Sequence, residues 1–153
     1  MNGKNKGNNS LPSNRLGDIL VKERAISANQ RDISIRASEA WGSTFKEVLF
    51  QQGYITEDGI VASLSRWYGV PKVDLWKIKK DPKAARIIPK MFAKKYCMFV
   101  VAREFSRIYI AMADPTNIFA LDDTRFLSQF EKVPMVSSEK DILQTIEDFY
   151  GPD

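Results

Sequence analysis

Apolar residues in the first third of the chain recur at helical spacing, and the pattern occurs twice. Residues 16–27 (LGDILVKERAIS) align without a gap on residues 45–56 (FKEVLFQQGYIT). Large apolar residues occupy the first, fourth and fifth positions of both copies, which is the spacing of one helix face. Each copy then passes through a turn to an isoleucine and a hydroxyl residue. The repeat predicts two helical hairpins of the same design.

The hydroxyl residue at the end of each copy is a good start for a second helix. Ser27 and Thr56 are preferred N-cap types, and the sequence SANQ at Ser27 has the spacing of a capping box. We therefore expect the second helices over residues 28–40 and 57–68. Gly69 is a suitable C-terminal stop for the later one.

The patterning changes at Lys72, and strand-forming runs follow. Residues 98–103 (MFVVAR) and 107–113 (RIYIAMA) are rich in β-branched and aromatic residues and lie close together, which predicts an antiparallel hairpin. A third short strand is expected at residues 132–136, where Pro134 favours a position at the sheet edge. Because this strand should follow a helical crossover, the sheet is expected to be mixed.

Further helices are expected around these strands. Their starts are marked by N-cap residues or prolines, namely Asp81-Pro82, Pro89, Asp114-Pro115-Thr116 and Ser137-Ser138. The third of these helices is expected over residues 117–129. The whole pattern predicts an α+β fold, in which an N-terminal helical-hairpin repeat subdomain is followed by a small three-stranded mixed sheet packed with helices.

These changes divide the chain into three parts. Residues 1–14 are mostly Asn, Gly, Lys and Ser, and so low an apolar content predicts a disordered tail. Residues 15–71 hold the helical repeat subdomain, and residues 72–153 hold the small α/β subdomain. The two subdomains are expected to be separate packing units joined near residues 69–74.

Composition limits the possible chemistry. The 153 residues include one cysteine and no histidine, which excludes an internal disulfide, a multi-cysteine zinc site and a histidine general base. The net charge of +4 is too small to predict nucleic-acid binding without clustering. No apolar run approaches the roughly 20 residues of a membrane helix, and the N-terminus lacks the apolar core of a secretory signal. A cytoplasmic protein without direct membrane insertion is expected.

No catalytic motif is recognisable. A phosphate-binding G-x-x-x-x-G-K-[ST] loop and a G-x-S-x-G motif are absent, so we expect no enzyme activity, no catalytic residue, no cofactor and no metal site. Cys97 has no evident base partner and is expected to be a buried structural cysteine. In the densest basic stretch, residues 77–95, charged and apolar residues interleave. An amphipathic helix with its charges in solvent is the simpler interpretation, and a surface for an anionic partner is the alternative.

Arg15-Leu16-Gly17 is the local motif that most suggests a specific role. It is either a helix start, with Arg15 in solvent and Gly17 permitting close packing of the hairpins, or part of a binding site. In the second case Arg15 and nearby backbone N–H groups would hold a phosphate or a guanine edge. The residue types alone leave both interpretations open.

Several ordered landmarks resemble one family. RLGDILVKERAIS and its second copy, then GVPKVDL at residues 69–75 and IEDFYG at residues 146–151, look like the N-terminal domain of type II secretion and type IV pilus assembly ATPases. The resemblance covers the chain from about Arg15 to its end. It implies a helical subdomain, an α/β subdomain and, in full-length relatives, a hexameric ATPase core that follows them.

One branch of that family binds cyclic di-GMP through two tandem motifs, each opening with Arg-Leu-Gly and closing with Gln. The resemblance carries this ligand site onto Arg15, Leu16, Gly17, Leu20, Ser38, Gly53 and Trp67. Ser38 and Trp67 stand where the closing glutamines are expected. Thr44 replaces the second leading arginine, and Arg31 replaces a leucine. The scaffold is therefore expected to remain while the dinucleotide site is degraded.

The function implied by the resemblance is docking without catalysis. We expect an interaction or regulatory domain that links a secretion or pilus-assembly motor to an inner-membrane platform protein or another regulator. Its partner would be the cytoplasmic part of that platform protein or the motor's own ATPase core. Arg31 and Trp67 are the partner-binding candidates, because Arg and Trp are enriched among interface anchors. The alternative is a cyclic di-GMP receptor domain with partly degraded motifs.

Overall fold

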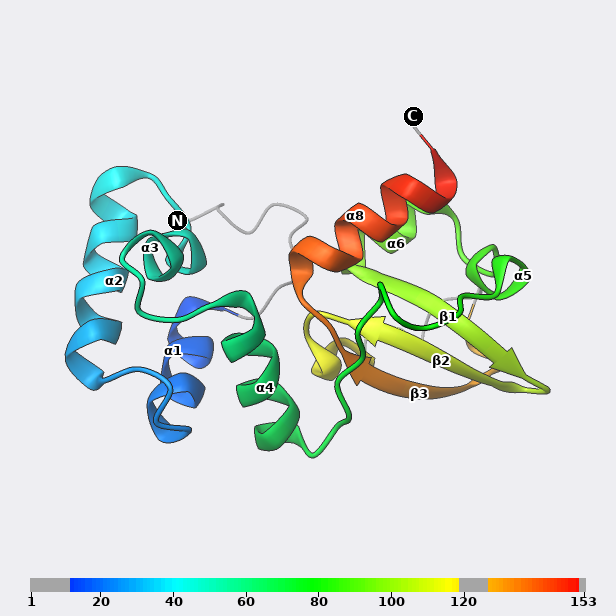
Figure 1. Ribbon diagram of the computed structural model, residues 1–153, viewed down its shortest axis with the longest axis horizontal. Coiled ribbons are helices and arrows are strands. Elements are labelled where there is room, and N and C mark those ends of the chain that lie inside the picture. Colours follow the sequence, from blue (N-terminus) through cyan, green and yellow to red (C-terminus); the bar gives the residue numbers. More distant parts are fainter. Residues whose placement is uncertain (1–11, 119–126, 152–153) are drawn as a thin grey trace. The chain divides into compact units, whose positions relative to one another are not determined.

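The computed structural model describes residues 12–118 and 127–151, which fall into two compact units, the first ending at Gly69 and the second beginning at Val70 (Figure 1). Most of the tail expected at residues 1–14 lies outside the described residues. Its last two residues are helical, because helix α1 (Ser13–Lys22) begins two residues earlier than expected. Pro12 takes the N-cap position and accepts a hydrogen bond from the N–H of Leu16 at 2.9 Å.

The first unit consists, in its described part, of paired helices. After α1 these are α2 (Ala28–Trp41), α3 (Phe45–Gln51) and α4 (Glu57–Tyr68). Ser27 caps α2 within a capping box and Thr56 caps α4, both as predicted. Thr44 forms a further capping box at the start of α3. The predicted pair of helical hairpins is confirmed.

The buried side chains of the first unit follow the sequence repeat. The first, fourth and fifth positions of the two copies are at most 3% exposed, and they are Leu16, Ile19, Leu20, Phe45, Val48 and Leu49. Helix α2 differs, since Ser34 is the one buried residue among its 14. Its apolar side chains Ile33 and Trp41 remain exposed. The core of this unit is therefore built mainly by α1, α3 and α4.

The described part of the second unit is built on a three-stranded sheet. Its strands are β1 (Met98–Glu104), β2 (Arg107–Met112) and β3 (Glu131–Val136), in that order across the sheet. β1 and β2 pair antiparallel and β2 and β3 pair parallel, which confirms the predicted mixed sheet. β3 lies at the edge, as Pro134 indicates, because proline has no N–H to donate to a further strand.

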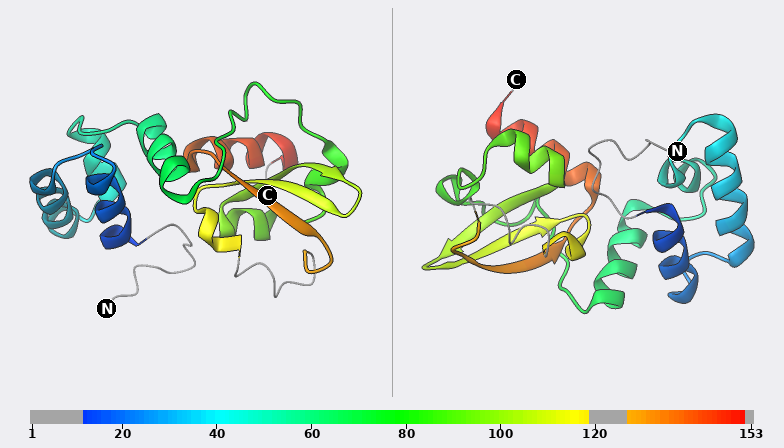
Figure 2. Two further views of the ribbon diagram at one scale, coloured as in Figure 1. Left: turned by 90° about the horizontal axis from the view of Figure 1, so that it is seen from below. Right: turned by 180° about the vertical axis from the view of Figure 1, so that it is seen from behind.

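Helices pack against one face of this sheet (Figure 2). Among the described residues, the helical segments of the unit are α5 (Pro82–Ala85), α6 (Lys90–Tyr96), the 3₁₀ turn η2 (Pro115–Asn117) and α8 (Glu139–Tyr150). α8 buries Ile142 and Ile146 completely. Its Phe149 ring meets Phe99 of β1 edge to face, with 5.6 Å between ring centroids. These contacts join α8 to the sheet.

The C-terminal end of α8 is also fixed to the segment around α5. The one proton of the Tyr150 hydroxyl is shared between the carbonyl oxygens of Ala85, at 2.5 Å, and of Ile88, at 2.9 Å. Burial raises the pKa of Tyr150, so the hydroxyl keeps the proton with which it donates.

The basic stretch at residues 77–95 is not one amphipathic helix, which corrects the simpler interpretation of its pattern. Asp81 caps α5, which is only four residues long, and Pro89 occupies the N-cap position of α6. A proline inside a helix lacks the N–H for the ladder and clashes with the preceding turn, so Pro89 separates the two helices. The basic side chains are therefore distributed over a loop and two short helices.

The helix expected over residues 117–129 falls mainly on residues 119–126, which lie outside the described residues. On the described flanks, η2 covers Pro115–Asn117 and residues 127–129 form a turn. Asp114 caps η2 by accepting a hydrogen bond from the N–H of Thr116 at 3.0 Å. The expected break after the second strand is therefore present.

Candidate functional site

Helix α1 carries the Arg-Leu-Gly motif, and its three residues have different surroundings. Arg15 is exposed, whereas Leu16 belongs to the core. Gly17 is buried, and a Cβ atom there would lie 2.9 Å from Cγ of Arg31 and 3.3 Å from Cζ of Phe45. Glycine thus permits the close approach of α2 and α3 to α1. This packing agrees with the structural interpretation of the motif.

Arg31 forms two ion pairs, one of which connects α2 to α1. Its Nη1 lies 3.0 Å from Oδ1 of Asp18 on α1, and its Nε lies 3.0 Å from Oδ1 of Asp32. The hydrogen bond to Asp32, together with the charges of both carboxylates, raises the pKa of Arg31 above its usual value. The side chain is 26% exposed, and its methylene groups cover Gly17. Arg31 is therefore a fixed cation that also contributes to helix packing.

Trp67 connects α4 to the other end of α1. The tryptophan is 42% exposed, and Nζ of Lys22 lies 5.7 Å from its ring centroid, within the range of a cation–π contact. Next to it, Nε of Arg66 lies 2.8 Å from Oε1 of Glu23. Trp67 is thus partly packed and partly available to solvent.

The two partner-binding candidates meet the same side of α1. Asp18, which pairs with Arg31, and Lys22, which lies over Trp67, are four residues apart and so about 6 Å apart along one helix face. α1 packs against both α2 and α4 (Figure 1). We call these residues together the α1 surface: Asp18, Lys22, Arg31, Arg66 and Trp67. Sequence reasoning missed three of them, although the spacing of Asp18 and Lys22 is typical of a helix pair.

The remaining residues of the expected ligand set have local structural roles. Leu20 is wholly buried in the core. The hydroxyl of Ser38 donates to the carbonyl oxygen of Ile35 at 2.8 Å, and Ser38 lies about 10 Å further along α2 than Arg31. Gly53 has a φ of 72°, the left-handed conformation that a turn after α3 requires. Thr44 accepts a hydrogen bond from the N–H of Glu47 at 3.1 Å as the cap of α3.

The described residues offer little for metal or thiol chemistry. Among them, no group of three or more Cys, Asp or Glu side chains is placed to hold a metal ion. Cys97 is buried, as predicted, at the end of α6. No helix in the described ranges has the length and apolar character needed to cross a membrane.

Residues 68–153 match the sequence profile of the MshEN domain. The chain belongs to the MshEN domain family. MshEN domains form the N-terminal domain of type II secretion and type IV pilus assembly ATPases, which confirms the resemblance seen in the sequence. The matched residues cover the second unit and the last residue of α4, so the whole α1 surface lies outside them.

Curated relatives of this MshEN domain are pilus motors. The type IV pilus assembly ATPase PilB of Myxococcus xanthus is 35% identical over 139 residues, which are 91% of this chain and 25% of the relative. PilB of Thermus thermophilus is 31% identical over 115 residues, which are 72% of this chain and 13% of the relative. The chain thus spans a quarter or less of the length of these motors.

Solved structures share the fold of this MshEN domain. A structure of MshE with cyclic di-GMP has a TM-score of 0.72 at 26% identity and covers 89% of this chain and 99% of that one. The N-terminal domain of XpsE has a TM-score of 0.66 at 21% identity and covers 90% of this chain and 95% of that one. Both confirm the predicted α+β fold.

Proposed function

We propose that this MshEN domain is a non-catalytic docking module of a secretion or pilus-assembly motor and that the α1 surface contacts a protein partner. The partner would be the cytoplasmic part of an inner-membrane platform protein or the motor's own ATPase core. The observation that carries the proposal is the 42% exposure of Trp67 beside fixed, charged neighbours. The relatives are motors of which this chain spans a quarter or less, which suits a module that acts through contacts.

The α1 surface has the physical properties of an interface centre. Tryptophan and arginine are the residue types that dominate binding energy, since each covers a large area and keeps a polar contact. Arg31 is held by Asp18 and Asp32, so a partner would find its guanidinium already oriented. Side chains that are ordered before binding lose less entropy when the complex forms.

A cyclic di-GMP receptor is the second candidate. It is supported by the likeness to MshE with cyclic di-GMP and by the exposure of Arg15 at the start of α1. The residues at the ligand-contacting positions argue against a receptor function. Ser38 and Trp67 cannot make the contacts of glutamines, and Thr44 cannot make those of an arginine. Docking to a protein therefore remains the primary proposal.

Trp67→Ala is expected to weaken binding to the purified cytoplasmic segment of the platform protein by about tenfold or more, which corresponds to ~1.4 kcal/mol. The reason is that alanine removes the largest exposed side chain of the α1 surface. Calorimetry or biolayer interferometry gives the affinity, and circular dichroism confirms that the variant is folded.

The matched control is Trp41→Ala, which makes the same change at a tryptophan that is 58% exposed at the end of α2. It should leave the affinity unchanged. Arg31→Glu is a less suitable probe, because the new carboxylate would face Asp18 and Asp32 and destabilise the packing over Gly17. Equal affinity of a folded Trp67→Ala variant and the unmodified chain would remove the α1 surface from the interface.

A further inference from the structure

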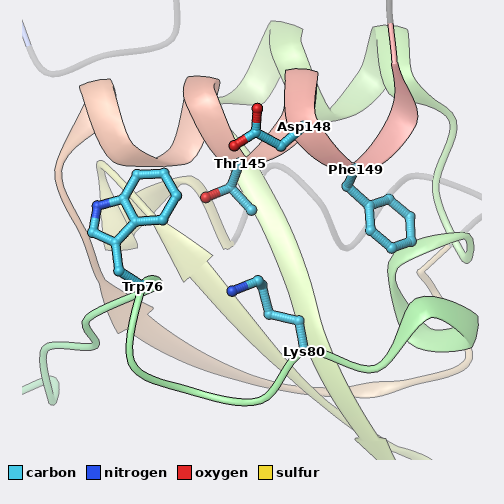
Figure 3. A pocket seen from close by; sticks show the side chains of 5 residues that line it. All are labelled: Trp76, Lys80, Thr145, Asp148 and Phe149. Atoms are coloured by element: carbon cyan, nitrogen blue, oxygen red, sulfur yellow. The ribbon is translucent and has the colours of Figure 1, made fainter.

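A hollow in the second unit lies outside the α1 surface. It has a volume of about 180 Å³ and is lined by Trp76, Lys80, Thr145, Asp148 and Phe149 (Figure 3). Trp76 and Lys80 come from the loop before α5, and the other three come from α8. Trp76 is 53% exposed, which is unusual for so large an apolar side chain. The hollow therefore presents an aromatic side chain beside charged ones.

A buried anchor and two hydrogen bonds fix the loop that carries Trp76. Leu75 is completely buried in the core of the unit and anchors the loop next to Trp76. Oδ1 of Asp74 accepts a hydrogen bond from the backbone N–H of Trp76 at 2.9 Å. Nζ of Lys80 donates to the carbonyl oxygen of Leu75 at 2.5 Å and so closes the loop. The backbone that carries the exposed indole is thus held in place before any contact forms.

The α8 side of the hollow contains an unpaired polar group. The hydroxyl of Thr145 is buried and has no hydrogen-bond partner among the described residues. In Figure 3 its oxygen points toward Trp76. A buried hydroxyl without a partner is unfavourable, and such a group in a native structure calls for an explanation. Because this oxygen is inaccessible to solvent, the hydroxyl forms part of the wall of the hollow and is not a contact point for a ligand.

The size of the hollow limits what it can hold. Pockets for whole cofactors or drug-sized ligands have volumes of roughly 300–1,000 Å³. An apolar cavity of about 150 Å³ accepts a benzene-sized group. At about 180 Å³ the hollow matches one apolar side chain of a polypeptide and is too small for a dinucleotide.

The charge around the hollow indicates the kind of polypeptide. Residues 72–95 contain nine Lys and Arg against two Asp, although the whole chain has a net charge of only +4. Both aspartates serve the local backbone, as Asp74 binds the N–H of Trp76 and Asp81 caps α5. Glu147 of α8 pairs with Lys90 and Lys94, and Asp148 of α8 adds one negative charge to the lining of the hollow. Lys77 and Lys79, which lie in the loop between Trp76 and Lys80, are exposed and have no carboxylate partner in the described part of the chain. This uncompensated charge favours an acidic partner.

We propose that the hollow is a docking pocket that receives one apolar side chain from an acidic segment of a protein partner. The anchor side chain lies between Trp76 and Phe149, and the flanking carboxylates of the segment meet the lysines of the loop. This site shares no residue with the α1 surface, and the proposal does not depend on docking through that surface.

The test uses two fluorescein-labelled ten-residue peptides rich in Glu and Asp, one with a central Phe and one with a central Ala. Each is titrated into the 153-residue chain while amide and indole N–H signals are recorded by NMR. The Phe peptide is expected to shift the indole signal of Trp76 and the amides of Thr145 and Phe149. It should bind about tenfold more tightly than the Ala peptide, because only it fills the hollow.

Variants and a nucleotide complete the test. Trp76→Ala should lower the affinity for the Phe peptide by about fivefold or more. The double variant Lys77→Glu, Lys79→Glu should lower the affinity for both peptides, whereas Trp41→Ala should leave both affinities unchanged. Equal affinities of the two peptides would reduce the site to a general electrostatic contact and overturn the proposal. Shifts that avoid Trp76, or stronger shifts of Trp76 with cyclic di-GMP than with the Phe peptide, would overturn it as well.

Discussion

Phe99→Ala is expected to lower the free energy of unfolding of the second unit by about 3–5 kcal/mol. Phe99 is completely buried at the centre of that unit's core and stacks edge to face on Phe149 of α8. Alanine would lose the transfer free energy of the ring and leave a cavity between β1 and α8. Because a small domain has a total stability of roughly 5–15 kcal/mol, the second unit should be largely destabilised. The first unit has its own buried repeat positions and should remain folded.

Urea denaturation followed through amide signals of the two units measures this effect. Phe105→Ala is the matched control, since Phe105 is 89% exposed at the turn between β1 and β2. It has a φ of 59°, a conformation that alanine tolerates no better, so the substitution should change the stability little. Equal loss of structure in both units of Phe99→Ala would contradict their separate packing.

Cyclic di-GMP is expected to bind this chain roughly 100-fold or more weakly than a variant in which the motif residues are restored by Ser38→Gln, Thr44→Arg and Trp67→Gln. Each hydrogen-bonding partner that is missing from a binding site removes about 1–3 kcal/mol, and three are missing here. The packing adds a further obstacle, because Arg31 covers Gly17 and is held by two carboxylates.

Isothermal calorimetry compares the two chains directly, and the shift of the melting temperature at excess ligand provides an independent measure. Thr44→Arg also removes the cap of α3, which costs about 1 kcal/mol, so the folded state of the variant must be verified. Sub-micromolar affinity of the unmodified chain that is lost on Arg15→Ala would contradict the degraded site and support the receptor function.

The fold was predictable where local sequence signals act alone. Ser27 and Thr56 mark the starts of α2 and α4 because their side chains pair with backbone N–H groups three residues later. Pro134 indicated the edge strand for an equally local reason. The helix starts at Asp81-Pro82 and Pro89 were also predicted correctly, whereas the charge alternation of residues 77–95 wrongly suggested one amphipathic helix.

The candidate sites depend on contacts that sequence spacing does not contain. Arg31 and Trp67 could be chosen by residue type, but their meeting with Asp18 and Lys22 on one side of α1 requires the packing of three helices. The hollow beside Trp76 combines a loop with α8, and the two segments are about 70 residues apart in the chain. No local pattern records such a juxtaposition.

Hydrogen–deuterium exchange of the chain with and without the purified cytoplasmic segment of the platform protein tests the docking function most directly. Docking through the α1 surface predicts slower exchange in peptides from α1 and from the C-terminal half of α4, the elements that carry Lys22 and Trp67. Exchange in β1 and β2 should stay unchanged. Slower exchange confined to residues 72–95, or no change under conditions that saturate binding, would contradict docking through the α1 surface.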